Sequence, residues 1–214
     1  MAGVLLQKLI IENTPALKDQ DHIKVVCFTN PHIPDRTKSL QEDGGKKFVA
    51  AITDSIKILE KAGVNCILMP CNTSHACFDN IQNATHIPIL NMIEIALDKI
   101  RELGASCVGL LSTDGVISSR VFNADKNLKI ILPDIDDQQK IMDAIYEIKS
   151  GKYNDSRILS EINAFIKKLE QKGAEKIILG CTELSIYSPF IKKENIVDPL
   201  VELSKEAVKM ATAV

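Results

Sequence analysis

The sequence predicts an α/β fold of two similar lobes, each a mostly parallel sheet flanked by helices, related by a pseudo-twofold axis. Two observations predict this fold. First, short runs of apolar and β-branched residues alternate with amphipathic stretches of helical length, which is typical of parallel α/β sheets. Second, the segment 59–73 (LEKAGVNCILMPCNT) aligns without a gap with 169–183 (LEQKGAEKIILGCTE), and such self-similarity is typical of repeated structural units.

The individual elements follow from the local pattern. Leu5, Leu9 and Ile10 recur at helical spacing, so an amphipathic helix is expected to open the chain. Strands are expected where apolar and β-branched residues cluster, at 23–28, 66–71, 87–92, 107–112, 129–133 and 176–181. Helices are expected over the amphipathic stretches 46–62, 93–103, 136–150 and 156–172.

The repeat continues beyond the aligned segments. Residues 89–94 (ILNMIE) and 197–202 (VDPLVE) each join an apolar strand end to a polar residue and a helix start. Helix–glycine–strand units resemble one another in general, but Cys71 and Cys181 also fall in register, which favours a true repeat. We place the first lobe at 1–92 plus 198–214 and the second lobe at 93–197.

Composition and charge exclude several classes of function. The 214 residues carry a net charge of −2, only 4% are aromatic and there is no Trp, so no nucleic-acid partner is expected. No apolar run reaches the roughly 18 residues that span a bilayer, so no membrane partner is expected. The first residues lack the basic region and cleavage site of a signal peptide, and we expect a cytoplasmic protein.

The six cysteines are irregularly spaced, and the sequence has neither Cys-x-x-Cys nor His-x-x-x-His. A disulfide framework and a metal site are therefore not predicted. Cys27, Cys66 and Cys107 lie inside apolar runs, where we expect them to be buried as small hydrophobic residues.

Cys71 and Cys181 are different, because each closes an apolar run and is followed by hydrogen-bonding residues. Asn72 and Thr73 follow the first cysteine, and Thr182 follows the second. In a parallel α/β unit the carboxyl end of a strand carries the ligand chemistry, and a following helix start favours an anion and a thiolate. Two related lobes would therefore place two thiols on opposite sides of one small anionic ligand.

Two thiols that face each other across a ligand indicate proton transfer. Inversion of a carbon acid needs a base on one face of the carbon and an acid on the other, and the roles exchange in the reverse direction. One ionised and one protonated thiol meet this requirement, provided that polar groups around the adjacent carboxylate stabilise the carbanion.

Four segments resemble the aspartate/glutamate racemase family. MPCNTSH (69–75) and LGCTEL (179–184) are similar to its two cysteine motifs. NPHIPDRT (30–37) and IYEIKSGK (145–152) resemble segments of the aspartate racemase branch, the second with one residue fewer between its tyrosine and its lysine. The resemblance covers nearly the whole chain.

This resemblance implies a homodimeric enzyme that uses neither pyridoxal phosphate nor a metal and acts on a dicarboxylic amino acid. Cys71 and Cys181 match the acid/base pair of the family. Arg36 and Lys149 match the residues that hold the distal carboxylate of aspartate, and a guanidinium fork suits two-point binding of a carboxylate. The residues that match the surroundings of the substrate's α-carboxylate and amine are Asn72, Thr73 and Thr182.

Three further residues accompany this site. The family has a Thr where Val116 stands, so Thr113 is expected to carry any contact there alone. His75 lies four residues after Cys71, where it would either tune the thiol or be a helix residue with a satisfied ring. Glu183 would either interact with Cys181 or cap its own helix.

The same residues leave other interpretations open. A glutamate racemase, a broad-spectrum amino-acid racemase or a related two-cysteine isomerase, such as one acting on maleate, would also use such a cysteine pair. Family members begin with a strand and a glycine-rich loop, whereas this sequence starts at Met1-Ala2-Gly3, and we expect that it starts late relative to them. An inactive, truncated remnant that only binds a ligand is therefore the alternative from another class.

Overall fold

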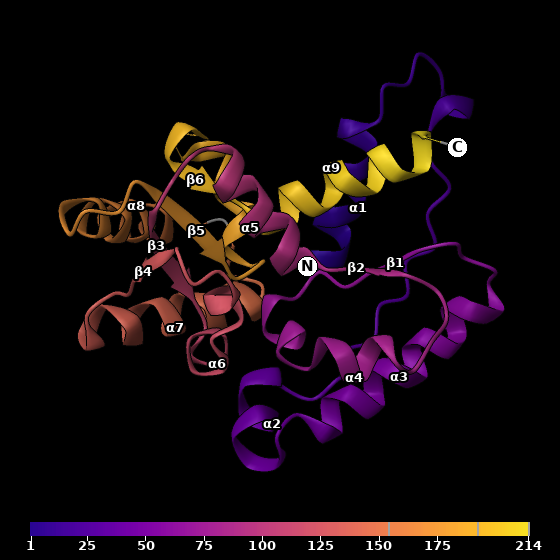
Figure 1. Ribbon diagram of the computed structural model, residues 1–214, viewed down its shortest axis with the longest axis horizontal. Coiled ribbons are helices and arrows are strands. Elements are labelled where there is room, and N and C mark those ends of the chain that lie inside the picture. The colour runs from indigo at the N-terminus through magenta and orange to yellow at the C-terminus, as the bar shows by residue number, and fades with distance from the viewer. Residues whose placement is uncertain (154, 192, 214) are drawn as a thin grey trace.

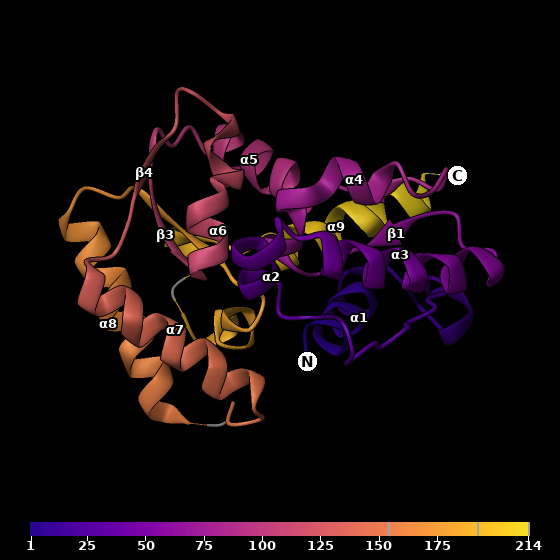
Figure 2. The ribbon, with the colours of Figure 1, turned by 90° about the horizontal axis from the view of Figure 1, so that it is seen from below.

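The computed structural model of the chain describes residues 1–153, 155–191 and 193–213, and it forms an α/β fold with two parallel sheets (Figures 1 and 2). Figure 1 shows the larger sheet on the left with α7 and α8, and the smaller sheet on the right with α3 and α4. Within the described residues, none of the helices combines the length and the apolar character needed to cross a bilayer. The predicted fold class is confirmed.

The larger sheet has four parallel strands in the order β4-β3-β5-β6. Their bounds are Cys107–Ser112 (β3), Lys129–Ile131 (β4), Lys176–Gly180 (β5) and Ile196–Val197 (β6). Alternate residues of β5 enter different cores, because successive side chains of a strand point to opposite faces. Ile177 and Leu179 pack with α7 (Ile135–Lys149) and α8 (Ser156–Gln171). Ile178 packs with α5 (Met92–Glu102) on the other face.

The smaller sheet is the parallel pair β1 (Ile67–Leu68) and β2 (Ile89–Leu90). One face packs on α3 (Lys46–Lys61) and α4 (Phe78–Gln82). The other face contacts the core formed by α1 (Ala2–Asn13) and α9 (Pro199–Thr212), which lie side by side in Figure 1. The remaining helices are α2 (Arg36–Asp43), α6 (Asp114–Ser119) and the 3-10 helices η1 (Asp19–Asp21), η2 (Asn72–Cys77), η3 (Val121–Ala124), η4 (Leu184–Ile186), η5 (Ser188–Phe190) and η6 (Lys193–Asn195).

The order of elements repeats as the sequence predicts. Helix α3, Gly63, β1 and Cys71 follow one another, as do α8, Gly173, β5 and Cys181. Both glycines adopt a left-handed conformation, with φ of 72° and 96°, that ends the helix and turns the chain toward the strand. Further on, Asn91 caps α5 after β2, and Asp198 caps α9 after β6. The lobe boundaries at 92/93 and 197/198 stay a prediction.

Two expectations about the first lobe are wrong. Residues 23–28 form no strand, because none of the described strands pairs with them. Val25, Val26 and Phe28 are exposed. An apolar extended segment becomes a strand only when a neighbouring strand accepts its hydrogen bonds. For the same reason Cys27 is exposed rather than buried. Cys66, just before β1, and Cys107, the first residue of β3, are half-buried rather than buried.

The expected strands 66–71 and 87–92 are each reduced to two residues. Pro70 follows β1 and Pro88 precedes β2, and a proline has no N–H to donate to a ladder. The carbonyl of Pro88 still accepts the Ile67 N–H at 2.9 Å. The strand pair therefore begins directly after Pro88 on β2 and ends before Pro70 on β1. This short sheet leaves Cys71 three residues beyond β1, at the carboxyl end of the strand pair.

Candidate active site

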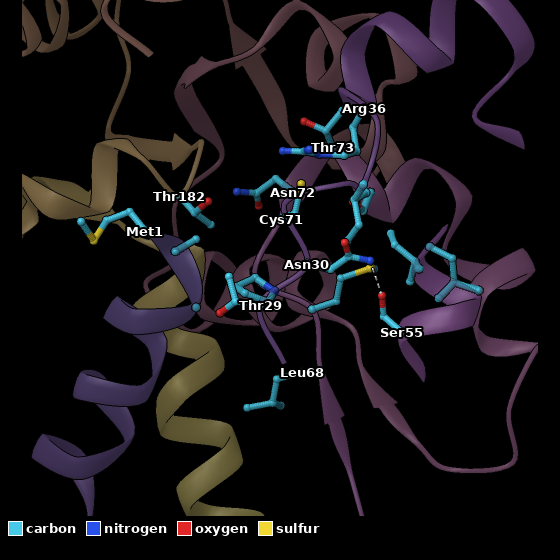
Figure 3. A pocket seen from close by; sticks show the side chains of 18 of the residues that line it. Met1, Thr29, Asn30, Arg36, Ser55, Leu68, Cys71, Asn72, Thr73 and Thr182 are labelled. Atoms are coloured by element: carbon cyan, nitrogen blue, oxygen red, sulfur yellow. Dashed lines mark hydrogen bonds between the residues drawn. The ribbon is translucent and has the colours of Figure 1, made fainter. Parts of the chain in front are cut away.

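One cavity of about 310 Å³ lies where the chain leaves β1 and β5. It contains both cysteines that the sequence singles out, Cys71 from the first lobe and Cys181 from the second. The other predicted site residues that line it are Arg36, Asn72, Thr73, Thr113, Lys149, Thr182 and Glu183. Figure 3 shows Cys71, Asn72, Thr73, Arg36 and Thr182 close together in this cavity. Of the predicted site residues, only His75 is not part of its wall.

Cys71 is half-buried and lies beside Arg36, the first residue of α2. Burial works against the charge of the guanidinium, but attraction to Cys71, Asp35 and Glu183 outweighs it and raises the pKa of Arg36. Nη1 of Arg36 donates to the Pro34 carbonyl at 3.3 Å, and among the described residues the guanidinium forms no ion pair with a carboxylate. A cation without a carboxylate partner therefore faces the cavity next to a thiol.

Cys181 is only 5% exposed, and its partner is Glu183. The Sγ–H donates to Oε2 of Glu183 at 3.0 Å, and the Thr182 hydroxyl donates to the same oxygen at 3.4 Å. Burial, followed by the nearby Glu183 carboxylate, raises the pKa of Cys181 well above its usual value. Cys181 is therefore a protonated thiol, and of the two roles considered for Glu183 the structure gives the contact with Cys181.

The side-chain amide next to Cys71 in the cavity wall has no hydrogen-bond partner among the described residues. Asn72 is 2% exposed, yet among the described residues neither Oδ1 nor Nδ2 of its side chain has a hydrogen-bond partner. A buried amide without partners costs roughly 1–3 kcal/mol, and a ligand in the cavity would supply the missing hydrogen bonds. Thr73 and Thr113 complete this wall: their hydroxyls lie 3.0 Å apart, and Thr113 also caps α6 by accepting the Val116 N–H.

Lys149, the last residue of α7, reaches the cavity from the second lobe. Its Nζ lies 3.7 Å from Oδ2 of Asp35 and 4.8 Å from the ring centroid of Tyr146. Asp35 caps α2 by accepting the Lys38 N–H at 3.0 Å. Burial opposes the charge of Asp35, but this hydrogen bond and the charges of Lys149 and Arg36 lower its pKa. The cap thus holds Lys149 and the start of α2 against each other.

His75 is buried, and both nitrogens of its ring make hydrogen bonds. Nε2 accepts the Met92 N–H at 3.2 Å, so the ring is neutral, and Nδ1 donates to the Cys71 carbonyl at 2.9 Å. The ring also stacks on Phe78, with centroids 5.5 Å apart. His75 therefore holds the backbone of Cys71 and connects it to the start of α5.

Burial lowers the pKa of His75 from 6.5 to about 4. The unfolded chain then binds more protons than the folded protein between these values, so this residue's contribution to stability is present above pH 6.5 and is lost as the pH falls toward 4. We expect about 3 kcal/mol of unfolding free energy to depend on pH in this window. Urea unfolding measures this contribution as a difference between variants: on acidification from pH 6.5 to 4, His75→Gln should lose about 3 kcal/mol less than the wild type, whereas the exposed His86→Gln control should follow the wild type.

Two further residues of the cavity wall are not among the predicted site residues. Asn30 and Ser55 line the cavity, and Nδ2 of Asn30 donates to the Ser55 hydroxyl at 3.1 Å (Figure 3). Asn30 is the first residue of the NPHIPDRT segment, so the motif could have indicated that it belongs to the site. Ser55 lies in the middle of α3, and nothing local marks it.

Comparisons with known proteins identify the family of this chain. Residues 1–211 match the family described as Asp/Glu/hydantoin racemase. The chain is 28% identical to the broad-specificity amino-acid racemase RacX of Bacillus subtilis over 196 residues, which cover 89% of this chain and 82% of that protein.

Two solved structures have the same fold. The aspartate racemase of Picrophilus torridus superposes with a TM-score of 0.84 and 28% identity, over 99% of this chain and 89% of that one. Glutamate racemase from Francisella tularensis, solved with D-glutamate, superposes with a TM-score of 0.68 and 19% identity, over 99% of this chain and 78% of that one. Because the family match spans nearly the whole sequence, the chain belongs to the Asp/Glu/hydantoin racemase family.

Proposed function

We propose that this protein is an isomerase that racemises aspartate by a two-cysteine mechanism. The observation that carries the proposal is that Cys71 and Cys181, from different lobes, line one cavity together with an unpartnered amide and two cations. Such a cavity has the groups needed to bind an amino acid and to move a proton on and off its α-carbon.

The proposed reaction uses only side chains. In one direction the Cys71 thiolate removes the α-proton: the C–H bond breaks, an S–H bond forms, and the electron pair stays on the carbon. Cys181 then gives its proton to the opposite face of the carbanion and becomes a thiolate. The reverse reaction exchanges the two roles. We assign Asn72, Thr73 and Thr182, which line the cavity, to the α-carboxylate and amine, where their hydrogen bonds would stabilise the charge that develops.

The charges of the cavity favour a dicarboxylic substrate. Arg36 presents a guanidinium that pairs with none of the described carboxylates, and Lys149 adds a second cation. A distal carboxylate would be a partner for both cations, and a guanidinium fork binds a carboxylate at two points. The aspartate racemase of Picrophilus torridus, with a TM-score of 0.84, supports the same substrate.

A broader substrate range is the second candidate. The cavity continues along apolar side chains of α3 and β1, including Ile52, Ile56 and Ile67, where a larger side chain would fit. The likeness to the broad-specificity racemase RacX favours this reading.

An enantiomer-resolved assay in D₂O tests the proposal. L- and D-aspartate, glutamate and alanine are supplied separately, and both enantiomers are measured by chiral chromatography and mass spectrometry. We expect aspartate to be inverted fastest, and the product to carry one deuterium at the α-carbon while the remaining substrate keeps its proton, since the acid and the base are different groups. Inversion of none of these amino acids would contradict the proposal, and inversion of alanine at the rate of aspartate would favour the broad-range candidate.

We also propose that the enzyme is a cytoplasmic homodimer, as its family resemblance implies. Light scattering after size-exclusion chromatography gives the mass directly. The 23.6 kDa chain should elute with twice that mass, and a mass equal to one chain would contradict the dimer.

A further inference from the structure

The Cys181–Glu183 pair raises a question that the two-cysteine reaction does not answer. After one inversion Cys181 is a thiolate and Cys71 is a thiol, so the free enzyme must move protons before it can accept the same enantiomer again. Cys181 lines the cavity but is only 5% exposed, so little of its sulfur is open to the water in the cavity. A neighbouring group that exchanges protons with this water therefore offers the more accessible route for replacing its proton.

Glu183 is the neighbour that can do this. Its Oε2 lies 3.0 Å from the Cys181 sulfur, within direct proton-transfer distance, and its side chain is half-buried in the cavity wall. The Thr182 hydroxyl, 3.4 Å from the same oxygen, restricts the carboxylate to this orientation. The carboxylate therefore connects a buried sulfur with the cavity and its solvent.

We propose that Glu183 carries a proton from water to the Cys181 sulfur each time the free enzyme resets after a turnover. This inference rests on the proposed racemase function. Water protonates the Glu183 carboxylate; then the O–H bond breaks, an S–H bond forms on the thiolate, and the carboxylate is regenerated. Cys71 loses its proton to solvent in the same reset, so the number of protons on the enzyme is unchanged.

The charged groups around the pair suit this role. Lys149 lies near enough to Cys181 to favour its thiolate, and Arg36 lies near enough to Glu183 to be attracted to its carboxylate. The two cations therefore compensate the negative charge of the pair, whether it lies on the Cys181 sulfur or on the Glu183 carboxylate. The pair can hold one proton on either atom without leaving an unbalanced charge in the buried part of the cavity.

Glu183→Gln tests the inference, because an amide keeps the shape and can accept a hydrogen bond but cannot carry the proton. The reset occurs in free enzyme after product release, so it limits kcat and not kcat/KM when initial rates are measured. We expect kcat for aspartate to fall roughly tenfold or more. KM should fall by the same factor, so that kcat/KM stays near the wild-type value. Glu183→Asp, which keeps a carboxylate, should retain more kcat than Glu183→Gln.

Chemical rescue provides a readout that a structural role would not move. Formate added to Glu183→Ala should raise kcat in a concentration-dependent manner, and chloride at the same ionic strength should not. Glu60→Gln is the matched control, since Glu60 accepts a hydrogen bond from Thr85 outside the cavity. It should leave kcat and KM unchanged.

Several results would overturn the inference. If kcat/KM falls as far as kcat and formate does not restore activity, Glu183 only positions the thiol. Equal kcat in Glu183→Gln and Glu183→Asp would exclude proton transfer through the carboxylate. Wild-type protein that inverts none of the amino acids would overturn the proposed function as well, whereas an active wild type with any of the former results overturns the role of Glu183 alone.

Discussion

Alanine in place of either Cys71 or Cys181 is expected to lower the rate of aspartate racemisation by about 10³-fold or more. Each thiol serves one face of the α-carbon, and the loss of a positioned acid or base typically costs 10²- to 10⁴-fold. Chiral chromatography of the two single variants, with L- and D-aspartate as separate substrates, measures the loss in both directions.

The two variants should differ in what they retain. Each keeps one thiol, so in D₂O each should still exchange the α-proton of one enantiomer without inverting it, and the two should favour opposite enantiomers. Cys107→Ala, the same substitution at a half-buried position outside the cavity, is the matched control and should keep wild-type turnover. Wild-type turnover in either Cys71→Ala or Cys181→Ala would refute the two-thiol mechanism.

Replacement of Arg36 by methionine is expected to lower kcat/KM for aspartate by about 10²-fold. A charge-assisted hydrogen bond is worth roughly 1.5–3 kcal/mol, and every 1.4 kcal/mol is a factor of ten. Methionine keeps an unbranched apolar side chain while it removes the charge and the donor fork. Arg36→Lys should recover part of the loss, because the charge returns without the two-point geometry.

The choice of substrate separates two roles of Arg36, since this residue lies beside Cys71 as well as in the proposed site of the distal carboxylate. If Arg36 binds that carboxylate, Arg36→Met should slow aspartate far more than alanine. An equal loss for both amino acids would show that the guanidinium acts on the thiol instead. Arg120→Met, at an exposed position outside the cavity, is the control and should leave both rates unchanged.

Much of the fold was predictable from local pattern. Helices α3, α5, α7 and α8 lie within two residues of the expected ranges, because each has an apolar face that must be buried. Strand β5 was predictable for a similar reason: KIILG is apolar on both faces and is covered by helices on both sides. The repeated cysteine positions also indicated that both thiols follow strands at the ligand-binding end.

Other features depended on contacts between residues far apart in the sequence. Residues 23–28 have the composition of a strand, but a strand exists only where a partner strand is available. The role of His75 was open for the same reason, because its ring accepts the Met92 N–H from 17 residues further along the chain. Glu183 contacts Cys181 only two residues away, but whether its side chain turns to the thiol or caps its own helix depends on the surrounding packing.

The sequence by itself determined the fold class, the family resemblance and the residue types of the site, because periodicity and motif spacing are local properties. Only the tertiary structure decided that Asp35 of the first lobe meets Lys149 of the second at 3.7 Å, that Ser55 joins Asn30, and that the two cysteines share one cavity. These distances join residues tens of positions apart, and the packing of whole helices and sheets sets them.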